Sequence, residues 1–523
     1  MLVLPGLLLL ISCQVIAGDI PEKTRGNHLP LIRREVKRAG GHAHLGRRGG
    51  GTAEIGVGDY LDLANQQVEL LYGDSRTGTR AVGPIGNDTA GIAGLVIQDQ
   101  YLAAIVETNT TVLETGSAGI LGFGFPAISV LWRQLLQAQL NNDPPSKRAE
   151  GRNLVARIFP DFNFRRPTFP SFEFLLPPSH AHTKRQNATL LSSAEVIASF
   201  ATYGPLFTRL ISQNMVESPM FAITLQRDTV DIGGNVGSLS IGELPNGIQT
   251  DSLTWVPLRA YTPQEGGLPP APEAPNEVYP LVWEIPIDDV YFDDVKLPRS
   301  SLSPPSISLS ALIDTGNSLI RGPQDVIAQI HSSLGGEDFD CGMPHNLTFQ
   351  IGGKLFSVDP RDFIHQSFTD SVQQCNTALA VTDPPGDGFL YSWSLGDPFL
   401  KSALAAFHYG NLTHPSQDPP RIGLLSTIPT DAAERLRQAV SAATEEGSGN
   451  FPATSQPAPS GTFVATGAGV GGVPQATHVP PDLNGSEPSS TNGAVYTAWS
   501  GAAWSPIWGT FGISILSFFC LVL

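Results

Sequence analysis

The segment from Ser306 to Pro323, SISLSALIDTGNSLIRGP, holds the clearest candidate for chemistry in this chain. An apolar run leads directly into Asp314, and a carboxylate at the end of a buried strand is costly to ionise unless it is well hydrogen-bonded. Gly316 permits a tight turn after it, and Thr315 and Ser318 supply hydroxyls that can hold the carboxylate or its neighbour. The alternative is a turn aspartate that caps the helix predicted next, over QDVIAQIHSSLG.

The composition predicts the kind of scaffold that must position this carboxylate. The chain has 523 residues, with 54 Gly and 44 Pro, which favours many short strands over a helical bundle. Its net charge of −17 argues against a nucleic-acid-binding protein. The stretches SPMFAITLQ, VGSLSIGEL, LTWVPL and VWEIPIDDVYF indicate strands separated by turns, and AYTPQEGGLPPAPEAPN, residues 260–276, indicates a surface loop.

In this context the Asp314 segment resembles the second active-site loop of the pepsin-like aspartic proteases, peptidase family A1. Further stretches match that family in order along residues 53–428, outside the insertions. They are VELLYGDSRTGT (the flap hairpin), GSAGILGFGFP, SPMFAITLQ with GSLSIGEL, the Cys341 to Cys375 region, and YSWSLGDPFLKSALAAFHYGN with RIGLL.

The resemblance implies an all-β, bilobal fold with Asp314 at the floor of the cleft between the lobes. It places Tyr72, Gly73 and Asp74 in the flap. The family uses two aspartates, one per lobe, which share a proton and activate a water molecule against a peptide bond. The expected partners are protein or peptide substrates. No cofactor, metal or nucleic acid is expected, and the chain is expected to be a monomer.

The sequence departs from this family in its first lobe. Asp-Thr-Gly or Asp-Ser-Gly occurs once, at Asp314, and only 21 residues separate Gly50 from Tyr72. The strand with the first catalytic aspartate is therefore expected to be missing near Ala64-Asn65, which leaves the N-terminal lobe incomplete. Three explanations stay open. The segment could be lost from the gene model, the chain could be an inactive homologue that binds at the cell surface, or two chains could each give one aspartate.

Both ends of the chain resemble processing signals. Residues 1–17 indicate a secretory signal peptide, with a buried helix as the alternative. Residues 18–52 are basic and indicate a pro-segment of a zymogen, held electrostatically across an acidic cleft, or a solvated arm. Residues 500–523 indicate a GPI-attachment signal, with a spanning helix as the alternative. Residues 429–499, rich in Ser, Thr, Pro and Gly, indicate a stalk, and together with this tail they make the chain similar to the cell-surface aspartic proteases of fungi.

A secreted chain would keep two cysteines, since Cys13 lies in the signal peptide and Cys520 in the tail. Cys341 and Cys375 are then predicted to form a disulfide. Candidate N-glycosylation sites are Asn87, Asn109, Asn187, Asn346, Asn411 and Asn484. The expected location is extracellular, on the plasma membrane or the cell wall.

These observations divide the chain as follows. The predicted parts are 1–17 signal peptide; 18–52 basic pro-segment; 53–215 truncated N-terminal lobe with a Pro-rich insertion at 141–190; 216–428 C-terminal lobe; 429–499 stalk rich in Ser, Thr, Pro and Gly; and 500–523 GPI signal or membrane anchor.

Overall fold

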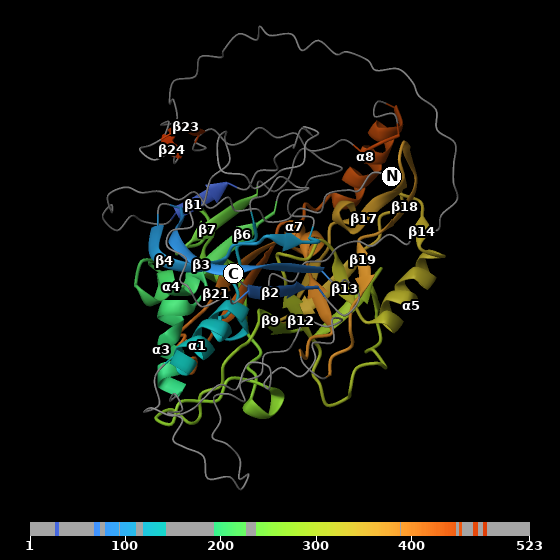
Figure 1. The fold of residues 1–523 in the computed structure, drawn as a ribbon. Helices are drawn as coiled ribbons and strands as arrows, with labels where there is room; N and C mark the ends of the chain where they lie inside the picture. The colour runs from blue at the N-terminus through green and yellow to red at the C-terminus, as the bar shows by residue number, and fades with distance from the viewer. Residues whose placement is uncertain are drawn as a thin grey trace.

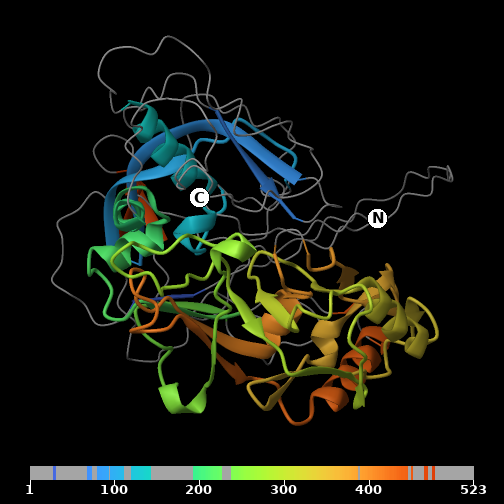
Figure 2. The same ribbon diagram turned by 90° about the horizontal axis from the view of Figure 1, so that it is seen from below.

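The computed structural model describes residues 27–30, 67–73, 79–93, 95–110, 119–142, 193–225, 237–386, 389–445, 449–451, 464–468 and 474–477. The predicted signal peptide, the predicted flap residue Asp74, nearly all of the predicted Pro-rich insertion and the predicted GPI signal lie outside these residues, as do Asn187 and Asn484. The described chain is mostly β-sheet and forms two lobes (Figures 1 and 2). Figure 2 separates the blue and cyan first lobe, above, from the yellow and orange second lobe.

A six-stranded sheet holds strands from distant parts of the sequence. Its order is β1 (Asn27–Pro30), β7 (Ser238–Ile241), β6 (Met220–Thr224), β21 (Ala403–His408), β22 (Arg421–Ser426) and β8 (Thr254–Pro257). Strand β6 is an apolar run that is almost wholly buried, as expected of a central strand covered on both faces. The strands predicted from SPMFAITLQ, VGSLSIGEL and LTWVPL are confirmed as β6, β7 and β8.

Three further sheets build the second lobe. The first has the order β19 (Leu379–Val381), β13 (Ile320–Gly322), β20 (Trp393–Leu395), β12 (Ser310–Ile313) and β9 (Glu284–Pro286). The second has the order β11 (Val295–Lys296), β10 (Asp289–Phe292), β15 (Leu347–Ile351) and β16 (Lys354–Ser357), and the third β14 (Asp338–Phe339), β18 (Ser371–Thr377) and β17 (Ile364–Phe368).

The first lobe contains a smaller sheet, β2 (Gln67–Tyr72), β3 (Thr79–Ile92) and β4 (Leu95–Ala103), with β5 (Glu107–Thr108) beside β3. Strand β2 buries alternate residues, Val68, Leu70 and Tyr72, as the period of a strand requires. These side chains pack against Leu131 and Leu135 of helix α1. In the described part of the chain, β2 is the edge strand of this sheet.

Short helices connect the strands in both lobes. The first lobe has η1 (Pro126–Ile128), α1 (Val130–Asn142), α3 (Ser193–Tyr203) and α4 (Leu206–Ser212); the second part has η3 (Thr250–Ser252), η4 (Pro263–Glu265), α5 (Gln324–Leu334), α6 (Pro360–Phe363), α7 (Asp397–Ser402) and α8 (Ala432–Glu445). No helix in the described ranges combines the length and the apolar character that crossing a membrane needs.

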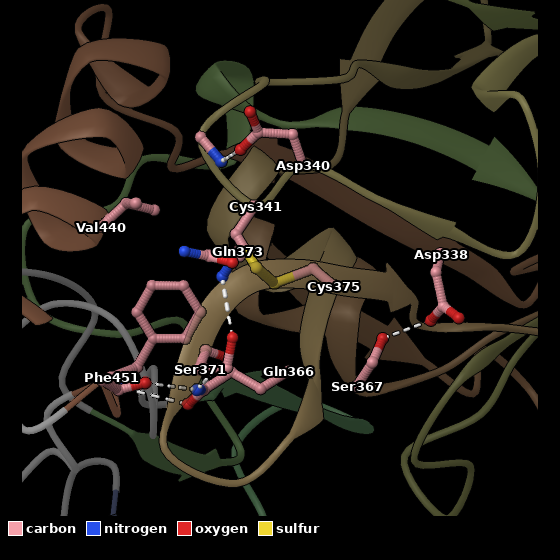
Figure 3. Close-up of a disulfide and its surroundings, with 12 residues drawn as sticks. Asp338, Asp340, Cys341, Gln366, Ser367, Ser371, Gln373, Cys375, Val440 and Phe451 are labelled. Atoms are coloured by element: carbon pink, nitrogen blue, oxygen red, sulfur yellow. Dashed lines mark hydrogen bonds between the residues drawn. A yellow bond between two sulfur atoms is a disulfide. The ribbon is translucent and has the colours of Figure 1, made fainter. Parts of the chain in front are cut away.

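The second lobe extends further along the chain than predicted. Helix α8 buries Leu436 and Ala443 completely, because its apolar residues share one face. After α8, the segment Gly449–Phe451 is held by Gln366: the Gln366 side-chain amide donates to the Gly449 carbonyl at 2.8 Å, and Phe451 N donates to the Gln366 amide oxygen at 3.0 Å (Figure 3). The predicted boundary at 428 is therefore too early, and the lobe reaches Phe451.

The predicted stalk, 429–499, is also not uniformly without structure. Strands β23 (Val464–Ala468) and β24 (Pro474–Thr477) form a two-stranded sheet within it. The prediction rested on the absence of a periodic apolar pattern. A two-stranded sheet can form from main-chain hydrogen bonds, which such a pattern does not report.

The disulfide between Cys341 and Cys375, predicted from the cysteine count, is present and links the β14 and β18 region across 34 residues. Both cysteines are fully buried. Figure 3 shows the bridge close to Val440 of α8 and to the segment that carries Phe451. The C-terminal end of the second lobe, α8 and the segment to Phe451, therefore packs beside the hairpin of β17 and β18 that the bridge crosslinks.

The loop 260–276 was predicted to lie on the surface, but four of its residues, Tyr261, Gly267, Leu268 and Ala271, are buried. Tyr261 is fully buried, and Leu268 and Ala271 are nearly so. Tyr261 also forms a β-bridge with Tyr279. The loop is turned inward because the Tyr261 hydroxyl donates to the buried carboxylate of Glu284, a long-range contact that local composition does not reveal.

Candidate functional site

Asp314 follows the last residue of β12, at the point where three strands meet. Strand β12 pairs in parallel with β20 and antiparallel with β9. Strand β20 also pairs antiparallel with β13. The strand that enters the Asp314 loop and the strand that leaves it therefore lie on either side of β20, which fixes both ends of the loop.

The loop holds the Asp314 carboxylate in a buried position, with the residue 6% exposed. Gly316 N donates to Asp314 Oδ1 at 2.9 Å. Asp314 N donates to the Leu395 carbonyl at 3.1 Å, which ties the aspartate to β20. Helix α5 begins after Pro323, its N-cap residue, without a side-chain cap. The alternative interpretation, in which Asp314 caps this helix, is therefore wrong.

Asn317 is a loop-supporting residue that the sequence analysis missed. It is 1% exposed, and its side-chain amide donates to Ser394 Oγ at 2.9 Å. Its amide oxygen accepts from Leu319 N at 3.1 Å. A Cβ atom on Gly396 would lie 1.9 Å from the Asn317 carbonyl oxygen. Only glycine at position 396 therefore permits the loop to lie this close to the end of β20. An asparagine directly after a turn glycine was the available signal.

One backbone carbonyl joins the first lobe to the strands around the site. The Phe123 oxygen accepts from Trp283 Nε1 at 2.8 Å and from the Tyr409 hydroxyl at 2.7 Å. Trp283 immediately precedes β9, and Tyr409 follows β21. Their rings pack against each other at 4.7 Å between centroids. The segment GFGFP is thereby fixed against the second lobe and the shared sheet.

The predicted flap residue Tyr72 ends β2, where its carbonyl accepts from Thr79 Oγ1 at 3.0 Å. The ring is buried in the cluster of Val68, Leu70 and α1, whereas Ile313, next to Asp314, belongs to the main core of the molecule. Gly73 follows with a positive φ of 86°. The tip of this hairpin, which contains Asp74, lies outside the described residues.

A buried carboxylate lies on the strand beside β12. Glu284 of β9 is fully buried and lies opposite Leu312 of β12 in the antiparallel pair. It accepts hydrogen bonds from Ser310 Oγ at 2.6 Å and from the Tyr261 hydroxyl. Burial raises the pKa of Glu284, although these hydrogen bonds and Arg259 oppose the shift.

We expect Glu284 to make the fold more stable in acid than at neutral pH. Below its ordinary pKa of 4.5 the group is protonated in both states and contributes nothing. As pH rises above this value the unfolded chain ionises first, so folding loses stability until the raised folded-state pKa is reached. Glu284→Gln should therefore lose less stability than the wild type between about pH 4 and pH 7, as measured by urea unfolding.

The control for this measurement is Glu434→Gln, on the exposed face of α8, whose side chain is 58% exposed. It should reproduce the wild-type pH profile. A Glu284→Gln profile that also overlays the wild type would contradict the assignment of this pH dependence to Glu284.

Four of the candidate glycosylation sites lie in described residues. Asn109 is exposed, and its side-chain oxygen accepts from Arg80 N at 2.7 Å. Asn87 lies within β3. Asn346 directly precedes β15, and Asn411 starts a turn in which its side chain accepts from Thr413 N at 3.0 Å. Asn109 is the exposed one of these four, whereas Asn87, Asn346 and Asn411 are half-buried.

Comparison with known proteins adds a second line of evidence. A family model described as "Eukaryotic aspartyl protease" matches residues 61–142 and 191–414. The two matched ranges leave out residues 143–190, which are nearly all of the Pro-rich insertion, and include Tyr72, Asp314 and most of both lobes. They amount to more than half of the chain.

Curated proteins with related sequences carry names of the same kind. The chain is 28% identical to Cathepsin E of Mus musculus over 236 residues, which cover 43% of this chain and 50% of that protein. It is 27% identical to Cathepsin D of Dictyostelium discoideum over 217 residues (40% and 49%), and 28% identical to Napsin-A of Mus musculus over 244 residues (44% and 50%). The chain thus spans about half the length of the curated relatives it matches.

Proposed function

The chain belongs to the eukaryotic aspartyl protease family, and from this we propose that it is an aspartic-type endopeptidase of the secretory route, with Asp314 as the second-lobe member of its catalytic pair. The observation that carries the proposal is the position of Asp314. It is buried, it follows β12, and its carboxylate accepts a hydrogen bond from Gly316 N at 2.9 Å.

In the proposed reaction Asp314 shares one proton with an aspartate of the first lobe, because two adjacent carboxylates cannot both ionise cheaply. The ionised member takes a proton from water, and the protonated member polarises the scissile carbonyl. The water then attacks the peptide carbon, so no covalent intermediate with the protein forms. The bonds from Asn317 to Ser394 and Leu319 would keep the Asp314 loop rigid during this step.

The first-lobe aspartate would come from a segment that belongs between Ala64 and Asn65. Two features support this part of the proposal. Strand β2 is an edge strand within the described residues. Arg133 of α1 is 8% exposed, burial lowers its pKa to about 10, and its Nε has no hydrogen-bond partner in the described residues. Buried guanidinium groups are normally paired, so a neighbouring segment is expected here.

Acid proteolysis of a denatured protein substrate tests the proposal. The chain as it stands should have little activity, because one of two cooperating groups is missing. A chain completed at Ala64-Asn65 with a strand, an Asp-Thr-Gly turn and a returning strand should cleave, and pepstatin should block it. In the completed chain, Asp314→Asn should lower kcat/KM at least about a thousandfold.

The matched control is Asp251→Asn, at an exposed position of η3, which should leave the activity of the completed chain unchanged. Cleavage that survives Asp314→Asn, or that pepstatin does not inhibit, would remove Asp314 from the mechanism. The transcript across the Ala64-Asn65 junction gives an independent answer, since an in-frame segment with Asp-Thr-Gly or Asp-Ser-Gly would supply the missing aspartate.

A second candidate function is that of a protease homologue without catalysis, which binds proteins at the cell surface. The single Asp-Thr-Gly in the sequence favours it. It predicts that no coding segment interrupts the junction and that Asp314→Asn changes neither surface display nor binding.

We further propose that the protein is made as a zymogen, secreted, glycosylated and anchored at the cell surface as a monomer. The disulfide between Cys341 and Cys375 supports an oxidising compartment. Strand β1 lies within the basic pro-segment and pairs with β7, with Asn27 opposite Ile241. This pairing supports a leader that is held by main-chain hydrogen bonds as well as by charge. The lipid would be attached near Ser500.

A further inference from the structure

Aromatic rings from both lobes meet around Trp283, the residue before β9. Phe125 of the first lobe packs against Trp283 with 4.6 Å between ring centroids. Trp283 also packs against Phe407 and Tyr409, at 5.1 Å and 4.7 Å. All four residues are buried. Apolar packing of this kind is non-directional, so it holds the lobes together without fixing how segment 122–126 lies against the second lobe.

Two hydrogen bonds supply the direction that ring packing lacks. The Phe123 carbonyl oxygen accepts from Trp283 Nε1 at 2.8 Å and from the Tyr409 hydroxyl at 2.7 Å. A carbonyl oxygen has two lone pairs, so these two donors occupy both. Both donor side chains are buried, and a buried donor that loses its acceptor is strongly penalised. We therefore expect the Phe123 carbonyl to move only together with both side chains.

Trp283 continues this connection to the candidate catalytic strand through its main chain. Its carbonyl oxygen accepts from Ile313 N at 2.9 Å. Ile313 is the last residue of β12 and directly precedes Asp314. One residue thus binds the first lobe with its side chain and the strand of Asp314 with its backbone. A displacement of segment 122–126 would pass through Trp283 to the carboxylate.

We propose that Trp283 and Tyr409 lock segment 122–126 in one position against the second lobe, and that Trp283 is thereby a positioning residue for Asp314. The positioning role rests on the proposed function, because it matters only where Asp314 shares a proton with an aspartate of the first lobe. The two carboxyl groups must then stay within hydrogen-bonding distance, and a misplacement of about 1 Å can cost about a hundredfold in rate. The lock itself does not depend on activity and can be measured on the chain as it exists.

The distance between the two lobes tests the lock. Spin labels would be attached to Gly119→Cys, close to segment 122–126, and to Leu355→Cys on β16, with Cys13 and Cys520 replaced by serine. Gly119 is exposed, and a Cβ atom there would meet nothing within 4 Å. Leu355 is 62% exposed. Pulsed electron paramagnetic resonance should give one narrow distance distribution for the labelled chain.

Loss of the hydrogen bonds should broaden this distribution. Tyr409→Phe should broaden it in part, and Tyr409→Phe combined with Trp283→Phe should at least about double its width. The matched control is Tyr291→Phe, which removes a hydroxyl that donates to Gln350 within the second lobe at 3.2 Å. It should leave the distribution as in the wild type.

An unchanged distribution in the double variant would overturn the lock. Tyr409→Phe removes a single oxygen atom, so it keeps the test open if the unfolding temperature shows that the double variant does not fold. In that case an unchanged distribution in Tyr409→Phe overturns the lock.

The completed chain described above tests the positioning role. There Tyr409→Phe should lower kcat about tenfold and Trp283→Phe about a hundredfold, while KM changes less than about twofold. A KM that rises as much as kcat falls would overturn the positioning of Asp314, because it would show that the substrate cleft as a whole had changed. A completed chain without activity would contradict the proposed function and with it the positioning role, whereas the lock is decided by the distance measurement alone.

Discussion

Asp359→Ala is expected to destabilise the second lobe by about 3–5 kcal/mol, because it leaves a fully buried guanidinium without its counter-charge. The side chains of Asp359 and Arg361 are both completely buried. Arg361 binds the carboxylate through two atoms, Nε to Oδ1 at 2.9 Å and Nη2 to Oδ2 at 2.7 Å. Urea unfolding followed by tryptophan fluorescence would measure the loss, with an unfolding temperature lower by roughly 10 °C.

The double variant Asp359→Leu with Arg361→Met is the control. It removes both charges together, so it should cost much less than the single substitution, as apolar replacement of buried pairs commonly does. A loss of less than about 1 kcal/mol in the single variant, or a double variant that is equally unstable, would contradict the prediction that Asp359 stabilises the lobe by neutralising the buried Arg361.

Replacing Cys341 and Cys375 together by serine is expected to cost about 4 kcal/mol, the chain-entropy value for a loop of 34 residues. The reduced wild type should fall to nearly the stability of this variant, whereas the variant itself should not respond to reductant. The measurement is urea unfolding with and without dithiothreitol.

The control is the double variant Ser332→Ala with Ser333→Ala on α5, which makes two small side-chain changes at exposed positions away from the disulfide. It should leave both the stability and the response to reductant as in the wild type. A cysteine-free chain as stable as the oxidised wild type would show that the hairpin is held by its packing alone.

The sequence predicted those parts of the fold whose signal is local. The apolar run before Asp314, the turn glycine Gly316 and the strand patterns of β6 to β10 each depend on neighbouring residues only. The disulfide followed from counting cysteines. Such patterns locate the strand end that carries the carboxylate without any knowledge of what packs around it.

The missed features depend on residues far apart in the chain. Asn317 binds Ser394 across 77 positions, and Phe123 meets Trp283 across 160. No window of the sequence contains both partners. The inward turn at Tyr261 likewise exists because Glu284 needs a donor in the core. The end of the lobe could have been placed better, since Leu436, Ala439 and Ala443 recur at helical spacing and are all buried.

The attachment of Gly449–Phe451 to Gln366 has a mechanical consequence (Figure 3). A pulling force on the chain beyond Phe451 would reach β17, through the hydrogen bonds of Gln366, before it reaches α8. Strand β17 pairs with β18, where Gln366 lies opposite Cys375, and the covalent bridge carries the load on to Cys341. Tension would thus be borne by a crosslinked hairpin at the edge of the lobe, while the strands around Asp314 remain unloaded.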